Sequence, residues 1–412
     1  MLGTLTRITT LLVAASILLV GHGLQLIALP VHAQLAGWSA AQIGLTGSFY
    51  FLGFIAGCVL NPAVVSSVGH IRAFMVMAAV ATVALLGAGL FVSVWAWMVF
   101  RLATGFALAG LYMVIESWLS DVSPKRQRGS VLAIYTMICL LGMALGQALM
   151  ALGTPGGLEL FILAAILITI AIVPIGLTKL PSPHPIPFIR FTPRKMIAAS
   201  RVAVGCAFLA GMVTSAFWTL GPLLGTAFGL ESGQIGVMMS LGILGGAVSQ
   251  LPIGRMSDRS DRRIVIGCVA SVGAVVAAAG FFFASTSHIA LYTSIFLLGA
   301  TMMPIYALCI AHASDSSELT MVEVTSVILM IHSIGSIIGP LIVAGLIAAT
   351  NATSYFAYSA VCLALAAFWS FFRLVVVERP REHATQAILP RTTQAVAELS
   401  TEHGVVDSGR AD

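Results

Sequence analysis

Twelve long apolar segments, separated by short polar breaks, constrain what this chain can fold into. A helix of about 20 residues, rising about 1.5 Å per residue, spans the roughly 30 Å hydrocarbon layer of a bilayer. The runs are continuous rather than alternating, so they predict helices, which satisfy their own backbone hydrogen bonds in lipid, and not barrel strands. The segments cover residues 8–30, 43–65, 73–93, 95–119, 131–152, 160–177, 197–220, 235–254, 264–284, 289–311, 322–349 and 355–376.

The composition agrees with a membrane protein. Hydrophobic residues make up 59% of the 412 residues and charged residues 8%, against roughly 25% charged residues in an average soluble domain. The six cysteines are scattered singly through apolar runs without a CxxC pair, so neither a disulfide framework nor a metal site is predicted. We therefore expect an all-α membrane protein with twelve transmembrane helices.

Lysine and arginine lie at the breaks or segment ends on one side, and only Arg101, well inside a segment, does not fit this pattern. The positive-inside rule then predicts that both termini are cytoplasmic in a multi-pass protein of the cell (inner) membrane. The first apolar run could imitate a signal peptide, but it lacks a small-residue cleavage pattern and is interpreted as the first spanning helix. Trp95 and Trp97 are expected to mark the outer interface.

A basic, proline-rich stretch divides the apolar segments six and six. We predict an N-terminal six-helix bundle over 1–178, a cytoplasmic linker over 179–196, a C-terminal six-helix bundle over 197–377 and a disordered cytoplasmic tail over 378–412. The basic residues lie in short breaks rather than on amphipathic faces, so no nucleic-acid partner is expected.

The two halves repeat at a nearly constant shift. Gly44 and Ser48 recur as Gly236 and Ser240 at a shift of 192 residues. A Gly-x-x-x-Gly pattern recurs at a shift of 193, as Gly142 and Gly146 and as Gly335 and Gly339. The offset favours two pseudo-symmetric six-helix halves in the same orientation, and the glycine pairs are most simply close helix contacts.

The most specific motif is the charged stretch 254–263 between the eighth and ninth segments. It resembles the signature Gly-x-x-x-Asp-Arg/Lys-x-Gly-Arg/Lys-Arg of the major facilitator superfamily, carried here by Gly254, Asp258, Arg259, Arg262 and Arg263. The resemblance implies a twelve-helix transporter fold in which these charges latch neighbouring helices at the cytoplasmic side. The alternative is a solvated turn that holds cytoplasmic charge.

On this resemblance, Asp258 would accept hydrogen bonds from the amide groups that begin the eleventh segment, and Glu323 would reach Arg262 or Arg259. The corresponding first-half loop keeps Gly69 and Arg72 but has Ser66 where the family usually has aspartate. The acidic latch is therefore expected to be absent there. Glu116 or Asp121, near the basic residue Arg128, could replace it.

Further patterns resemble the YcaD-like branch of that superfamily over nearly all of 8–376. Arg101 is followed by regularly spaced small residues, as in the family's fourth-helix motif, where an arginine has been proposed to take part in proton coupling. The remaining patterns are Glu116-Ser-Trp118-Leu119, Arg128-Gly129, Gly142-x-x-x-Gly146-Gln147 and Gly335-x-x-x-Gly339-Pro340.

Arg101 is the residue whose place most needs explaining, because an ionisable side chain in hydrocarbon costs at least about 2.5 kcal/mol. At about 100° per residue, Tyr112 and Glu116 lie on its stripe, which is expected to face the interior. Glu116 is about 22 Å along the helix and so is not its partner. His22 lies at nearly the same depth and Gln25 one turn beyond, which suggests a cavity for an anionic or hydrogen-bonding substrate, or a proton relay. Alternatively, His22 bonds a backbone carbonyl where helices pack closely.

Other polar or aromatic residues within spanning segments are candidates for the same pathway. Isolated residues of this kind are more often packing or interface residues than ligands. The candidates are Gln147 in the first half and Trp218, Gln250, Tyr306 and His332 in the second.

We predict a secondary active transporter that moves a small solute by alternating access of two bundles, most simply coupled to protons. The chain has no P-loop GxxxxGK[ST], so direct ATP drive is not expected. The alternatives are a drug or metabolite efflux antiporter with a mainly apolar cavity, and a non-transporting membrane sensor on the same fold. No enzyme activity, cofactor or metal is predicted, and the chain is expected to act as a monomer with a small-molecule substrate.

Overall fold

The computed structural model describes residues 2–124, 128–154, 156–178, 193–319 and 321–376, and all of its elements are helices. This part of the chain has twelve helical spans that are long and apolar enough to cross a membrane. The helices are α1 (Leu2–Leu35), α2 (Ala40–Val68), α3 (His70–Leu90), α4 (Val94–Val122), α5 (Arg128–Ala148), the 3₁₀ helix η2 (Leu149–Leu152), α6 (Glu159–Ile170), α7 (Ile172–Gly176), α8 (Pro193–Ala199), α9 (Arg201–Ala227), α10 (Ser232–Arg259), α11 (Arg262–Phe283), α12 (His288–Asp315), α13 (Met321–Ala349) and α14 (Ser354–Val376).

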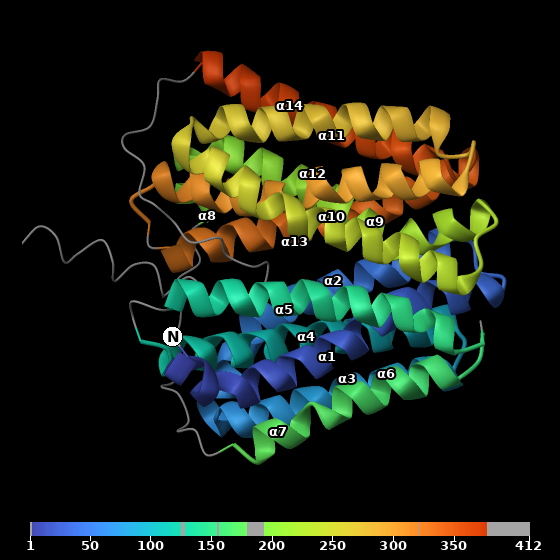
Figure 1. Cartoon of the computed structure of the whole chain (residues 1–412), viewed down its shortest axis with the longest axis vertical. Coiled ribbons are helices and arrows are strands. Elements are labelled where there is room, and N and C mark those ends of the chain that lie inside the picture. The colour runs from blue at the N-terminus through green and yellow to red at the C-terminus, as the bar shows by residue number, and fades with distance from the viewer. Residues whose placement is uncertain (1, 125–127, 155, 179–192, 320, 377–412) are drawn as a thin grey trace, which may run out of the picture.

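The helices form two bundles that lie side by side, α1–α7 in one and α8–α14 in the other (Figure 1). The predicted fold class, twelve spanning helices in two six-helix halves, is confirmed. We call the end where α1 begins and α14 ends the proximal end, and the opposite end, with the turns 36–39 and 228–231, the distal end. Most of the predicted linker and the predicted tail lie outside the described residues.

Several helix ends differ from the prediction. α1 continues through Pro30 to Leu35, because a proline inside a spanning helix is tolerated where neighbouring helices pack around it. α10 continues to Arg259, so Gly254 and Asp258 lie in a helix and not in a loop. Only residues 260–261 connect α10 to α11, and the charged motif is therefore held rigidly between two helix ends.

One of the two predicted interfacial tryptophans is buried. Trp95 is 77% exposed at the distal start of α4, as an interfacial residue would be. Trp97 is 1% exposed, donates from Nε1 to the Ala88 carbonyl at 2.8 Å and packs against Trp38. Its prediction was wrong because two residues along a helix turn the side chain through about 200°, from the outer face to the interior.

The glycine pairs inside each half are sites of close helix contact, as predicted. A Cβ on Gly146 would lie 2.1 Å from the Val20 carbonyl oxygen, which packs α5 against α1. A Cβ on Gly335 would lie 2.1 Å from the Phe208 carbonyl oxygen, which packs α13 against α9 in the same way. Small residues at such positions allow helix backbones to approach where lipid supplies no hydrophobic driving force.

The two halves join at the distal end through a pair of repeated contacts. Ser48 Oγ on α2 donates to the Ile337 carbonyl at 2.6 Å, and Ser240 Oγ on α10 donates to the Ala144 carbonyl at 2.8 Å. The two donors, Ser48 and Ser240, are related to each other by the sequence repeat, because they lie 192 positions apart. The two acceptors, Ala144 and Ile337, are related in the same way at 193 positions.

One turn nearer the distal end, the same helices approach still more closely. A Cβ on Gly44 would lie 2.7 Å from the Pro340 carbonyl oxygen, and one on Gly236 would lie 2.5 Å from the Gln147 carbonyl oxygen. A third hydrogen bond between the halves, from Thr226 Oγ1 to Gln34 Oε1 at 2.6 Å, lies in the same distal half. The structure is therefore closed at its distal end.

Candidate substrate cavity

A cavity of about 170 Å³ lies between the two halves and is lined by residues of both. About 10–15 Å³ of such volume is enough to hold one water molecule, so the cavity has room for a small solute. Its N-terminal wall comes from α1, α2, α4 and α5 and its C-terminal wall from α9, α10, α12 and α13. A site at the interface of two repeats is the arrangement on which transporters with rocking bundles depend.

Arg101 is the one charged side chain among the described residues that line this cavity. It is 6% exposed, and its Cζ lies 4.6 Å from the centre of the Tyr50 ring, at the distance of a cation–π contact. Its Nη1 has no hydrogen-bond partner among the described residues. The guanidinium is thus stabilised on one face by an aromatic ring and left with donor capacity in the cavity.

Tyr50 connects Arg101 to the predicted histidine. His22 Nε2 lies 3.4 Å from Tyr50 Oη, and the His22 ring is 6.3 Å from the ring of Tyr112. Sequence reasoning placed His22, Arg101 and Tyr112 in one pathway, and all three line the cavity. It missed Tyr50, because nothing distinguishes this tyrosine in its segment until α2 is packed against α4.

The C-terminal wall holds a second histidine. His332 Nε2 lies 3.3 Å from Thr214 Oγ1, and its ring is 4.7 Å from the ring of Tyr306 in an edge-on arrangement. Ser336 Oγ lies 3.5 Å from His332 Nδ1. Trp218 and Gln250 line the cavity beside them, so the second-half candidates are brought together.

The two walls are related by the repeat. α4 and α12 begin 194 residues apart, and the same shift superposes Tyr112 on Tyr306. Each of these tyrosines packs edge-on against a histidine, His22 in one half and His332 in the other. The histidines themselves come from non-equivalent helices, α1 and α13. The cavity therefore has a titratable group on either side of the plane between the bundles.

Two predicted pathway residues are not among the residues that line the cavity. Gln25 and Gln147 are fully buried. Gln25 lies behind the lining, next to His22 on the same helix, α1. Gln147 follows Gly146, whose face packs on α1.

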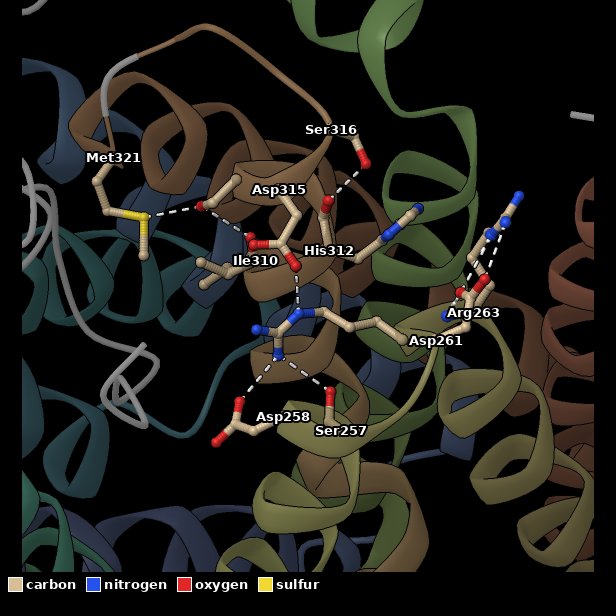
Figure 2. Close-up of polar contacts among 11 residues, drawn as sticks. Ser257, Asp258, Asp261, Arg263, Ile310, His312, Asp315, Ser316 and Met321 are labelled. Carbon is tan, nitrogen blue, oxygen red and sulfur yellow. Dashed lines mark hydrogen bonds and ion pairs between the residues drawn. The ribbon is translucent and has the colours of Figure 1, made fainter. Parts of the chain in front are cut away.

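A charge cluster lies at the proximal end of the C-terminal half (Figure 2). Arg262, the first residue of α11, is 3% exposed and donates from Nε to Asp315 Oδ2 at 2.5 Å. Its Nη1 donates to Asp258 Oδ1 at 3.3 Å and to Ser257 Oγ at 3.1 Å. The cluster ties the ends of α10, α11 and α12 together.

Asp261, in the short connection between α10 and α11, caps the second of these helices. Its Oδ1 accepts from the Arg263 backbone N–H at 2.9 Å, and its Oδ2 pairs with Arg263 Nη2 at 2.9 Å. Burial alone would raise the pKa of the Asp261 carboxyl, but these hydrogen bonds and the adjacent guanidinium hold the pKa below its usual value.

The cluster contains partners that the predicted latch did not include, and the predicted hydrogen bonds from the start of the eleventh segment to Asp258 stay a prediction. Asp258 is paired with Arg262 of its own motif, four residues along the chain, and Asp315 on α12 completes the cluster. Asp315 was missed because the tenth segment was ended too early at residue 311. The helix repeat could have found it, since the 194-residue shift of α4 onto α12 superposes Asp121 on Asp315. The reach of Glu323 to Arg262 or Arg259 stays a prediction, and Arg259 is exposed.

The first half carries a neutral equivalent of this cluster. Ser66 Oγ donates to the Ala63 carbonyl at 2.9 Å. His70, which the 192-residue shift superposes on Arg262, is 2% exposed, and its Nε2 lies 2.9 Å from Ser117 Oγ. Arg72 and Asp121 are exposed and Glu116 is fully buried, while the side chain of Arg128 lies outside the described residues.

The fold and the interfacial cavity define a membrane transporter built from two repeated bundles, and comparison with known proteins assigns it to a family. The sequence matches the Major Facilitator Superfamily over residues 11–200 and 203–403, and the chain belongs to that family. It is 28% identical over 315 residues to the "Uncharacterized MFS-type transporter YcaD" of Escherichia fergusonii, covering 75% of this chain and 80% of that one.

Solved structures share the fold at low sequence identity. A bacterial homologue of the human lysosomal transporter Spinster, in an inward-facing and occupied conformation, aligns with a TM-score of 0.70 at 16% identity, covering 90% of this chain and 97% of that one. The E. coli fucose:proton symporter FucP aligns with a TM-score of 0.58 at 15% identity, covering 90% and 99%. The chain is thus a multi-pass transporter and not an enzyme.

Proposed function

We propose that this protein moves a small solute across the cytoplasmic membrane by alternating access, with both termini cytoplasmic and with transport coupled to protons. The observation that carries the proposal is the cavity between the two repeated halves, with the titratable residues His22 and His332 on its opposite walls. In this orientation the distal end, where the two halves are joined, is the outer end.

Alternating access is supported by the way in which the halves touch. At the distal end they are joined by hydrogen bonds and close glycine approaches. Such contacts can be exchanged for others at the proximal end by rocking of nearly rigid bundles, which the close packing inside each half maintains. The charge cluster around Arg262 stiffens the proximal end of one half.

Proton coupling is supported by the chemistry of the lining. Among the cavity residues that the structure describes, none is Asp or Glu, and histidine is the side chain that titrates nearest to neutral pH. The fold relative FucP is described as a proton symporter. An efflux antiporter for amphipathic compounds is a second candidate, because Phe54, Met143 and Met303 make much of the wall apolar.

Flux into proteoliposomes, with and without an imposed pH gradient, tests the proposal. Uptake or release of a labelled solute that follows the gradient is expected. Replacement of both histidines, His22→Gln and His332→Gln, is expected to abolish the response to the gradient while exchange of the solute at equal pH persists. His288→Gln is a matched control, because that histidine lies at the distal start of α12 and away from the cavity. A flux through the parent protein that is the same with and without the pH gradient would refute the proton coupling.

A further inference from the structure

We propose that the transported solute is a small organic monoanion, a carboxylate with a short apolar body, and that Arg101 binds its carboxylate. This substrate class rests on the proposed transport function and goes beyond it. It follows from the charge, the free hydrogen-bonding capacity and the shape of the cavity.

The positive charge of Arg101 in the cavity favours an anionic solute. Arg101 is 6% exposed, and within the described part of the chain no Asp, Glu or Lys joins it in the lining. A guanidinium remains charged at any physiological pH, and a charge removed from water needs a counter-charge. Among the lining residues that the structure describes, the Tyr50 ring lies against the guanidinium and no acidic side chain does. A bound anion would complete the pairing, whereas a cation would be repelled.

The hydrogen-bonding groups select a carboxylate. Arg101 Nη1 is buried without a partner among the described residues, and a buried donor left without a partner is costly. The planar guanidinium matches a carboxylate, which it can bind through two parallel hydrogen bonds. The Tyr50 ring lies 4.6 Å from Cζ of the guanidinium and accepts no hydrogen bond from Nη1, which is left for this role. A single fixed cation favours a monoanion over a dianion.

The apolar residues of the cavity wall indicate that the part of the solute beyond its carboxylate is apolar. Leu26, Phe54, Leu140, Met143, Met303 and Leu329 line the cavity with apolar surface, and its volume is about 170 Å³. An inorganic anion would leave this surface without contact. A carboxylate with a few methylene groups would fill it, and each buried methylene contributes to affinity.

Thermal unfolding of the purified full chain tests the proposal, since a ligand that binds the folded state raises its apparent stability by an amount that grows with the logarithm of ligand concentration over Kd. The probes are sodium acetate, propionate, butyrate and hexanoate, each compared with its uncharged amide at equal ionic strength. Sodium nitrate controls for anions in general. We expect carboxylate affinity to rise about fourfold per methylene until the cavity is filled, and each amide to bind about tenfold or more weakly.

Variants connect the effect to Arg101. Arg101→Gln is expected to remove the preference for carboxylate over amide, and Arg101→Lys to keep part of it. Arg255→Gln is the matched control, because that arginine is exposed near the proximal end of α10. If Arg101→Gln does not fold, the comparison of carboxylate with amide in the parent protein still decides the question.

Several results would overturn the assignment. An amide that stabilises the protein as much as its carboxylate would overturn it, and so would nitrate that stabilises it as much as butyrate does. It would also be overturned if no carboxylate stabilised the protein, or if a folded Arg101→Gln protein kept the preference for carboxylate over amide. The same carboxylates and a set of neutral and cationic solutes are then tested for flux into proteoliposomes. Flux of a neutral or cationic solute alone would refute the anion while leaving the transport function intact.

Discussion

Replacing the two glycines at the distal contact, Gly44→Trp with Gly236→Trp, should drive the protein out of its distally closed state. A Cβ at Gly44 already lies 2.7 Å from the Pro340 carbonyl oxygen, and a Cβ at Gly236 lies 2.5 Å from the Gln147 carbonyl oxygen. These atoms are backbone atoms of the opposite half and cannot rotate away. An indole at either place therefore fits only if the halves separate.

The size of the effect follows from the cost of overpacking, which is typically about 1–3 kcal/mol per site. The two contacts involve different helix pairs, α2 with α13 and α10 with α5, so their costs should add to about 2–6 kcal/mol. Since about 1.4 kcal/mol is a factor of ten in an equilibrium constant, the ratio of open to closed distal end should rise about 30-fold or more.

Labelling of one engineered cysteine measures this ratio. Thr219 is 3% exposed behind the distal contact, where its side chain meets Gly47. Thr219→Cys in a background without other cysteines should react slowly with a membrane-impermeant maleimide applied from the distal side. The double tryptophan variant should react about 30-fold faster or more, in line with the shifted equilibrium.

Gly345→Trp supplies the matched control for this labelling. A Cβ there would have no neighbour within 4 Å, although the residue lies on the same helix, α13, as Pro340. Its labelling rate should equal that of the parent. Equal rates in the double variant, with the protein still folded by thermal unfolding, would refute the idea that these glycines hold the distal end closed.

The proximal charge cluster gives two further predictions. Asp315→Asn should lower the apparent Tm more than Asp258→Asn does, because breaking a buried pair costs up to about 3–5 kcal/mol and Asp315 is 6% exposed against 31% for Asp258; equal losses in thermal unfolding would contradict this. The lowered pKa of Asp261 means that its carboxylate stabilises the fold above about pH 4 and loses this contribution as the pH falls through the lowered pKa. Asp261→Asn should therefore lower the apparent Tm at neutral pH, and the gap from the parent should narrow in acid; a gap that is constant down to about pH 3 would speak against it.

The number and class of helices could be predicted from the sequence because membrane spans are determined by length and hydrophobicity, which are local properties. The same holds for the glycine contacts, since small residues at a spacing of four mark a surface on which helices meet. Helix ends were less predictable. The tenth segment was ended four residues before Asp315, so a polar final turn, held by tertiary ion pairs, was taken for a loop.

The partners of the polar residues could not be predicted. A soluble helix reveals its rotation through an apolar face, but a spanning helix is apolar on its lipid side and on its protein side alike. The periodicity therefore does not say that Gln25 is buried behind the cavity lining or that Tyr50 is part of the lining. These placements depend on how α1, α2 and α4 rotate against one another.

By itself, the sequence determined that this chain crosses a membrane twelve times, that its halves repeat, and that Arg101 is too costly in lipid to be without a role. Only the tertiary structure decided what surrounds Arg101, namely the Tyr50 ring on one face and a cavity without an acidic side chain among its described lining residues. The physical reason is that the cost of burying a charge is set by the residue, whereas its compensation comes from other helices and depends on how they pack.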